Sequence, residues 1–148
     1  MAVDLGLRLP PDWAGRPPHM APADADLWFR WKPGRLAGAS ALYFDVALGT
    51  GAPSPEGTAP EMARAWSRLT ALRADVVVEF PDRWSIVELR AHAGASALGA
   101  LLSYLALWRE SPPDQRPASG SIVTDFLNDD VVRSARGFQI PVVGLGPS

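Results

Sequence analysis

The feature that most constrains the fold is the stretch RADVVVEFPDRWSIVELR, which occupies residues 73–90. Two runs rich in β-branched and aromatic residues, VVVEF and WSIV, flank the tripeptide PDR. Such runs favour strands, and proline followed by aspartate is typical of a tight turn. Because the two runs are so close in the chain, the stretch predicts an antiparallel hairpin in the middle of the protein.

The register of this hairpin decides where its acidic residues lie. A four-residue turn over residues 80–83 places Asp75 opposite Glu88, and the alternation of side chains then puts both on one face together with Arg90. A three-residue turn shifts one strand by a residue and separates Asp75 and Glu88 onto opposite faces. The sequence leaves both registers open, and only the first one forms an acid pair.

An acid pair on one face predicts a particular chemistry. Two opposed carboxylates repel unless a cation lies between them or one carries a proton. Mg²⁺ is held by one or two carboxylates with water and phosphate oxygens, so Asp75 and Glu88 are candidate ligands. Arg90 would stabilise negative charge on a phosphate beside the metal, and Glu79 and Glu61 are further candidate acids. The alternative is that Asp75 and Glu88 are surface charges with Arg90 as their salt-bridge partner.

The chain from residue 58 onward alternates predicted helices and strands. Thr58 is a candidate helix N-cap, and Glu61 three residues later completes a capping box. The elements predicted after the hairpin are an apolar helix over 96–108, a strand over 121–127, a helix over 128–138 and a strand over 140–146. The resulting order, αββαβαβ, predicts an α/β fold with a mixed central sheet flanked by helices.

The N-terminal part differs in composition from the rest. Residues 1–26 are rich in proline and lack periodicity, which predicts an extended arm. A short helix or aromatic turn and a strand over residues 41–49 follow. We therefore divide the chain into an arm with an accessory strand, residues 1–57, and an α/β core, residues 58–148.

Three tryptophans lie in or beside the predicted arm. Trp13, Trp28 and Trp31 are candidate partner-binding residues, because large aromatic side chains are enriched at protein interfaces. Stacking of these side chains on nucleic-acid bases is the alternative.

The composition excludes several classes of function. There are no cysteines, so disulfides, zinc–thiolate sites and thiol catalysis are excluded. The formal net charge of -2 gives no global attraction to nucleic acid, so any DNA contact has to be local. The sequence has neither an apolar run long enough to span a membrane nor a signal-peptide pattern, and the default expectation is a cytoplasmic location.

At the hairpin the chain resembles the PD-(D/E)XK nuclease superfamily, which has the restriction-endonuclease-like fold. Ala74-Asp75 matches the first element of the family motif, and Glu88-Leu89-Arg90 matches the second. The predicted helix and strands that follow also fit the family order, so the resemblance covers residues 58–146.

This resemblance implies a Mg²⁺-dependent nuclease that cleaves DNA phosphodiester bonds. Asp75, Glu88 and Arg90 would be its catalytic residues, and Asp75 and Glu88 would bind the metal. The sequence departs from the family pattern at Arg90, where lysine is expected, and at Ala100, where many active members carry glutamine or lysine. The resemblance therefore also fits a family member that has lost catalysis.

A second resemblance concerns the N-terminal part. The segments PPDWAGRPPHMAPADADLWFRW, LYFDV and PEGTAPEM are similar to uncharacterised proteins of tailed phages. This implies a virion structural protein, such as a head–tail connector, a neck protein or a head-completion component, assembled in the host cytoplasm. It would bind other virion proteins in an oligomeric assembly, without a membrane or a cofactor and with DNA contact left open. We take this as the leading hypothesis, with the nuclease and a small cytoplasmic regulator as alternatives.

Overall fold

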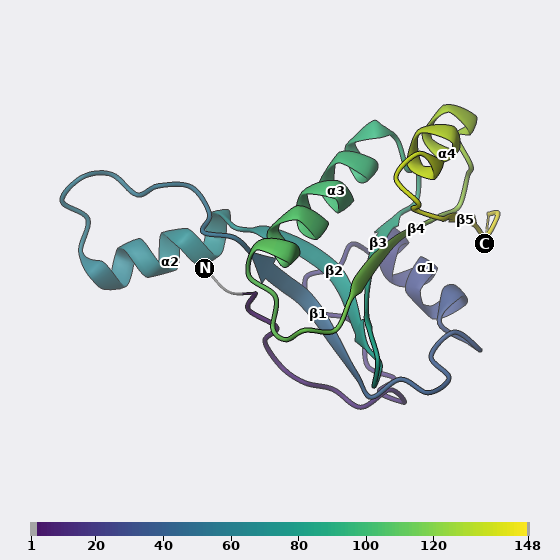
Figure 1. Ribbon diagram of the computed structural model, residues 1–148, viewed down its shortest axis with the longest axis horizontal. Coiled ribbons are helices and arrows are strands. Elements are labelled where there is room, and N and C mark those ends of the chain that lie inside the picture. Colours follow the sequence, from purple (N-terminus) through teal and green to yellow (C-terminus); the bar gives the residue numbers. More distant parts are fainter. Residues whose placement is uncertain (1–2, 148) are drawn as a thin grey trace.

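Five strands form one mixed sheet in the computed structural model, which describes residues 3–147 (Figure 1). The strands lie side by side in chain order: β1 (Ala41–Leu48), β2 (Leu72–Glu79), β3 (Trp84–Arg90), β4 (Ala118–Thr124) and β5 (Val142–Gly144). Strand β2 runs antiparallel to both β1 and β3, whereas β4 and β5 run parallel to β3. The predicted α/β class with a mixed sheet is confirmed.

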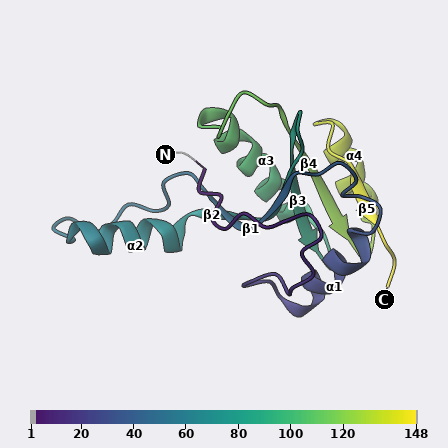
Figure 2. The same cartoon turned by 90° about the horizontal axis from the view of Figure 1, so that it is seen from below.

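Helices cover both faces of this sheet, as Figure 2 shows. The helices are α1 (Pro22–Trp31), α2 (Pro60–Thr70), α3 (Ala95–Glu110) and α4 (Asp129–Arg136). One face packs against α3 and the other against α1, while α2 projects away from the sheet (Figures 1 and 2). The predicted order from residue 58 onward is confirmed, and α1 and β1 precede it.

The hairpin of β2 and β3 has the four-residue turn. Glu79 pairs with Trp84, and the ladder continues to Val76 opposite Val87. The turn itself is closed by a hydrogen bond of 2.9 Å from the Phe80 N–H to a carbonyl oxygen. This is the register that places the two acids of the strand ends opposite each other.

The core is divided by the sheet into two layers. On the α3 side, Trp84 and Trp108 pack edge to face with ring centroids 5.3 Å apart. Here β4 approaches α3 so closely that a Cβ atom at Gly120 would lie 2.9 Å from a methyl carbon of Leu101, so a larger residue would force Leu101 to shift. On the α1 side, the buried residues include Leu27, Trp28, Phe44, Val87 and Leu89.

The three tryptophans proposed as partner-binding residues lie on this second layer. Trp28 is fully buried and Trp31 is 8% exposed. Trp13 is half-buried and packs on Phe44 with ring centroids 5.3 Å apart. The apolar surface that these side chains contact is therefore the protein's own sheet, and only a small part of Trp31 and part of the half-buried Trp13 remain accessible.

Residues 3–21 run along the outer edge of β1. Isolated bridges join Asp4 to Ala47 and Leu9 to Leu42, with hydrogen bonds in both directions. The bridges protect an edge strand that would otherwise present unpaired backbone groups. Because β1 also pairs along its length with β2 and supplies both core layers, the sheet shows no separation at residue 57.

Two local predictions are wrong. Helix α2 begins at Pro60 with Ala59 as its N-cap and no side-chain cap, because the Thr58 hydroxyl donates instead to the Pro55 carbonyl oxygen at 2.5 Å. Strand β4 begins three residues before the predicted position, at Ala118, because SG pairs with β3 despite its low strand propensity. Tertiary contacts override local preference at both places.

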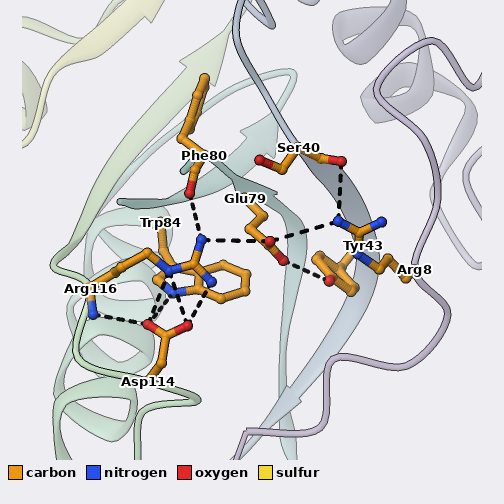
Figure 3. A network of polar contacts seen from close by, with 8 residues as sticks. All are labelled: Arg8, Ser40, Tyr43, Glu79, Phe80, Trp84, Asp114 and Arg116. Carbon is orange, nitrogen blue, oxygen red and sulfur yellow. Dashed lines mark hydrogen bonds and ion pairs between the residues drawn. The ribbon is translucent and has the colours of Figure 1, made fainter. Parts of the chain in front are cut away.

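Glu79 lies at the turn end of the hairpin, in the polar network of Figure 3. It accepts a hydrogen bond of 2.8 Å from the Tyr43 hydroxyl, and its carboxylate lies 3.6 Å from Arg116 and 3.8 Å from Arg8. Glu79 therefore links the N-terminal segment to the sheet. It does not join the acids at the other end of the hairpin.

Arg116 is the centre of this network. Its guanidinium stacks on Trp84, donates to the Phe80 carbonyl oxygen at 2.6 Å and forks onto the Asp114 carboxylate at 2.6 and 3.0 Å. Asp114 also accepts a hydrogen bond of 3.0 Å from the indole N–H of Trp84. Arg116 and Asp114 belong to the α3–β4 loop, and the hydrogen bond to Phe80 connects this loop to the hairpin turn.

We expect Arg116→Met to lower the free energy of unfolding measurably, since it removes several charge-assisted hydrogen bonds and a stacking contact. The measurement is urea unfolding followed by tryptophan fluorescence. The matched control is Arg133→Met, whose side chain is 72% exposed and pairs only with a neighbour on its own helix. Equal effects of the two changes would contradict a structural role for Arg116.

Candidate functional site

Asp75 lies where the β2–β3 ladder ends. The last backbone pair is Val76 with Val87, and beyond it the Leu89 N–H donates to the Asp75 carboxylate at 2.9 Å. The Asp75 side chain thus accepts the Leu89 N–H in place of a backbone carbonyl oxygen of β2. One carboxylate oxygen is thereby fixed, and the group is aimed at Glu88.

Glu88 is a buried carboxylate in the middle of the sheet. Its side chain is 1% exposed, on the face covered by α3. Arg90 donates from Nε to Oε1 at 2.9 Å, and the Tyr104 hydroxyl and the Asp75 carboxyl are near enough to influence the pKa of Glu88. The other oxygen, Oε2, is buried without a hydrogen-bond partner in the described part of the chain.

A third acid, Asp24, reaches the same place from α1. Its carboxylate faces the Ala91 N–H and is close enough to Arg90 and Asp75 to interact with their charges. We call Asp24, Asp75 and Glu88 the acid site. Its members come from α1 and from the two strands of the hairpin, which lies far from α1 in the sequence.

Arg30 fixes the position of α1 against the end of the sheet. It donates to Asp26 at 2.8 Å, to the Gly146 carbonyl oxygen at 3.0 Å, and to Asp125 just after β4. These contacts tie the helix that carries Asp24 to the segments that follow β4 and β5. The orientation of α1 is therefore set by polar contacts as well as by its buried tryptophans.

Thr124 fixes the turn that follows β3. Its buried hydroxyl donates to the Ala91 carbonyl oxygen at 3.1 Å and accepts from the Ala93 N–H at 3.1 Å. The same Ala91 carbonyl accepts from the Asp125 N–H at 3.2 Å. The backbone that presents Arg90 and the Ala91 N–H to the acid site is thus held by β4.

The electrostatics of the acid site favour protonation. Burial and the nearby Asp75 charge raise the pKa of Glu88 to about 7, although Arg90 acts in the opposite direction. Burial also raises the pKa values of Asp75 and Asp24. Burial and the nearby acids raise the pKa of Tyr104, so this hydroxyl stays protonated. Three carboxyl groups share one guanidinium, and a proton or a cation is needed to balance them.

The structure brings together Asp75, Glu88 and Arg90, the three residues that the hairpin pattern singled out. It does not bring Glu61 to them, because this residue lies exposed at the start of α2. Asp24 was missed by the sequence reasoning, although the sequence carries a signal for it. Asp24 lies three, four and seven residues before Leu27, Trp28 and Trp31, so it shares their buried helix face.

Two carboxyl groups of the acid site are of the kind that a hard divalent cation takes as ligands. Within residues 3–147 no cluster of three or more side chains has metal-ligand geometry. Mg²⁺, however, is held by one or two carboxylates with water and phosphate completing the shell. Asp75 and Glu88 supply such a pair, and the unpartnered Oε2 of Glu88 is an oxygen that a cation would satisfy.

Comparisons with protein-family models, with curated proteins and with solved structures yield no match to this chain. Among the helices of residues 3–147, none has the length and apolar character needed to cross a membrane. Function therefore has to be argued from the acid site itself.

The raised pKa of Glu88 predicts a stability that depends on pH. The folded state holds the Glu88 proton more tightly than the unfolded state, in which the pKa is near 4.5. This contribution is complete below about pH 4.5 and is lost as the pH rises through about 7. We expect the loss to be on the order of 3 kcal/mol, measured by urea unfolding between pH 5 and pH 8.5.

The control for this prediction is Glu88→Gln, which has the same shape and no titrating proton. The variant should lose much less stability than the wild type over the same pH range. If both proteins show the same pH profile, the Glu88 carboxyl is not the group responsible.

Proposed function

We propose that this protein is a divalent-metal-dependent nuclease that hydrolyses phosphodiester bonds of DNA at the acid site. The observation that carries the proposal is the convergence of Asp75 and Glu88, with a buried carboxylate oxygen left without a partner. The resemblance of the hairpin to PD-(D/E)XK nucleases supports the same assignment.

The energetic cost of the acid site also supports a function. A buried, incompletely paired carboxylate destabilises the fold, and an apolar side chain at position 88 would avoid that cost. Groups with strongly perturbed pKa values are enriched in functional sites for this reason. The Glu88 side chain lies in the apolar core layer under α3, where a residue kept only for packing would be apolar.

The residues of the acid site have separate roles in this proposal. Asp75 and Glu88 would hold Mg²⁺, which would supply a Lewis acid and an activated water for phosphodiester hydrolysis. Leu89 keeps Asp75 in place through its N–H. Asp24 carries a further carboxylate, close enough to Arg90 and Asp75 to orient them or to accept a proton.

Arg90 is suited to bind the phosphate. Its Nε–H donates to Glu88, and its side chain is 46% exposed. The two terminal nitrogens are therefore able to point outward, where a planar guanidinium binds phosphate oxygens in pairs. Arg90 keeps its proton and cannot act as a general acid or base, so its role is limited to electrostatic stabilisation and positioning.

The test uses supercoiled and single-stranded DNA with Mg²⁺ or Mn²⁺. We expect cleavage by the wild type and a loss of at least about 100-fold in rate for Glu88→Gln and Asp75→Asn, because each removes a metal ligand. Glu110→Gln, an exposed glutamate at the end of α3, is the matched control and should retain the wild-type rate. If the wild type and all the variants cleave DNA at the same rate, the activity comes from a contaminating nuclease and the proposal is wrong.

A second candidate function is a non-catalytic structural component of a tailed-phage virion. The specific observation in its favour is the ion pair of Arg90 with Glu88, at 2.9 Å. An arginine that neutralises the buried acid permanently makes the hairpin a stable scaffold without a metal. The N-terminal resemblance to tailed-phage proteins supports this candidate.

The virion candidate predicts that the chain is part of the assembled particle. Mass spectrometry of particles purified on a density gradient should then detect it in a constant ratio to the major capsid protein. Recovery only from the particle-free fractions would exclude this role. The wild type should in addition show no metal-dependent cleavage.

A further inference from the structure

Helix α2 presents an apolar face that the described residues of the chain leave largely exposed. Met62 is 67% exposed, Trp66 44% and Leu69 78%, and no residue of α2 is buried. These three residues lie at i, i+4 and i+7, so they form one stripe, which we call the α2 face. In Figures 1 and 2 the helix projects away from the sheet, so the stripe is accessible along its length.

The β1–α2 loop packs along one side of α2. Ala52 donates to the Thr70 hydroxyl at 2.7 Å, and the Trp66 indole donates to the Pro53 carbonyl oxygen at 3.2 Å. The loop approaches so closely that a Cβ atom at Gly51 would lie 2.3 Å from the Ser67 carbonyl oxygen, and Gly51 has a φ of +72°. The α2 face is thus held in a fixed orientation, which lowers the entropy cost of docking.

Charges beside the α2 face point to a particular occupant. Glu61 lies in the first turn and Arg68 in the last turn of the helix, and both are exposed. They are seven residues apart, so at 100° per residue they lie on the same flank of the stripe. The other flank carries Ala63 and Thr70, which are small and uncharged.

A second copy of the chain matches this pattern. When two α2 helices pack antiparallel about a two-fold axis, the same flank of each helix meets that of the other. Glu61 of each copy then faces Arg68 of the other, which makes two equivalent ion pairs. The helix dipoles are also antiparallel, and the Met62, Trp66 and Leu69 side chains of both copies are covered.

We propose that the chain forms a symmetric homodimer through antiparallel pairing of its α2 faces. One pair of short helices buries less surface than the 1,200 Å² or so of a typical stable interface. The dimer is therefore weak, with a dissociation constant on the order of 10 μM. It does not require the acid site, and its failure would leave the proposed nuclease activity untouched.

Charge reversal tests the antiparallel arrangement directly. In Glu61→Arg both contacts become Arg–Arg, and in Arg68→Glu both become Glu–Glu, so each variant alone should dimerise roughly tenfold more weakly. An equimolar mixture of the two restores both ion pairs across the interface. Its affinity, measured by sedimentation velocity between about 1 and 200 μM, should return to within about threefold of the wild type.

Apolar substitutions test the face itself. Met62→Ser with Leu69→Ser should abolish dimerisation over the same concentration range while leaving the melting temperature of the monomer unchanged, because these side chains are exposed in the single chain. Phe138→Ser, an equally exposed apolar residue elsewhere, should dimerise like the wild type. A wild type that stays monomeric at 200 μM, or a charge-reversed mixture no tighter than its components, overturns the proposal.

Discussion

The register of the β2–β3 hairpin is the constraint on which the acid site depends. The four-residue turn sets Val76 against Val87, and the ladder stops there, so Asp75 is free to bond the Leu89 N–H with its side chain. A slip of one residue would turn Glu88 toward the α1 layer and place an apolar residue under α3. Because both faces of the sheet are covered, the register decides which core layer holds the Glu88 carboxyl. Only the observed register places it beside Asp75 and Tyr104.

The sequence was sufficient to predict those parts of the fold that depend on local patterns. The hairpin follows from its β-branched runs and turn chemistry, and the order of elements from residue 58 follows from periodicity. The sequence left two hairpin registers open, and it is the four-residue turn of the structure that places Asp75, Glu88 and Arg90 together. It was not sufficient for Asp24, because the proline-rich composition before it predicts an arm and hides a helix that begins at Pro22. Proline is tolerated in the first turn of a helix, so composition alone misplaced the boundary.

Helices α1 and α2 show why periodicity cannot say where an apolar face is buried. Both are short, both begin with proline, and both carry tryptophan at helical spacing. Trp28 of α1 is completely buried against the sheet, whereas Trp66 of α2 is 44% exposed. The difference comes from tertiary connections: Arg30 ties α1 to the ends of the sheet, while the β1–α2 loop holds α2 away from it. Apolar residues at helical spacing therefore predict an apolar helix face, but not whether that face packs in the core or lies exposed as in α2.

In the proposed function, Arg90 and a divalent cation would bind different oxygens of the same buried acid. Arg90 binds one oxygen of Glu88 and leaves the other without a partner, so it does not fully balance the charge of the acid site. With the pKa of Glu88 raised to about 7, a proton makes up the difference at lower pH. A metal ion would have to displace that proton, so its affinity should rise with pH while the stability of the metal-free protein falls. The same buried carboxyl that costs stability at neutral pH therefore makes the acid site most receptive to a cation there.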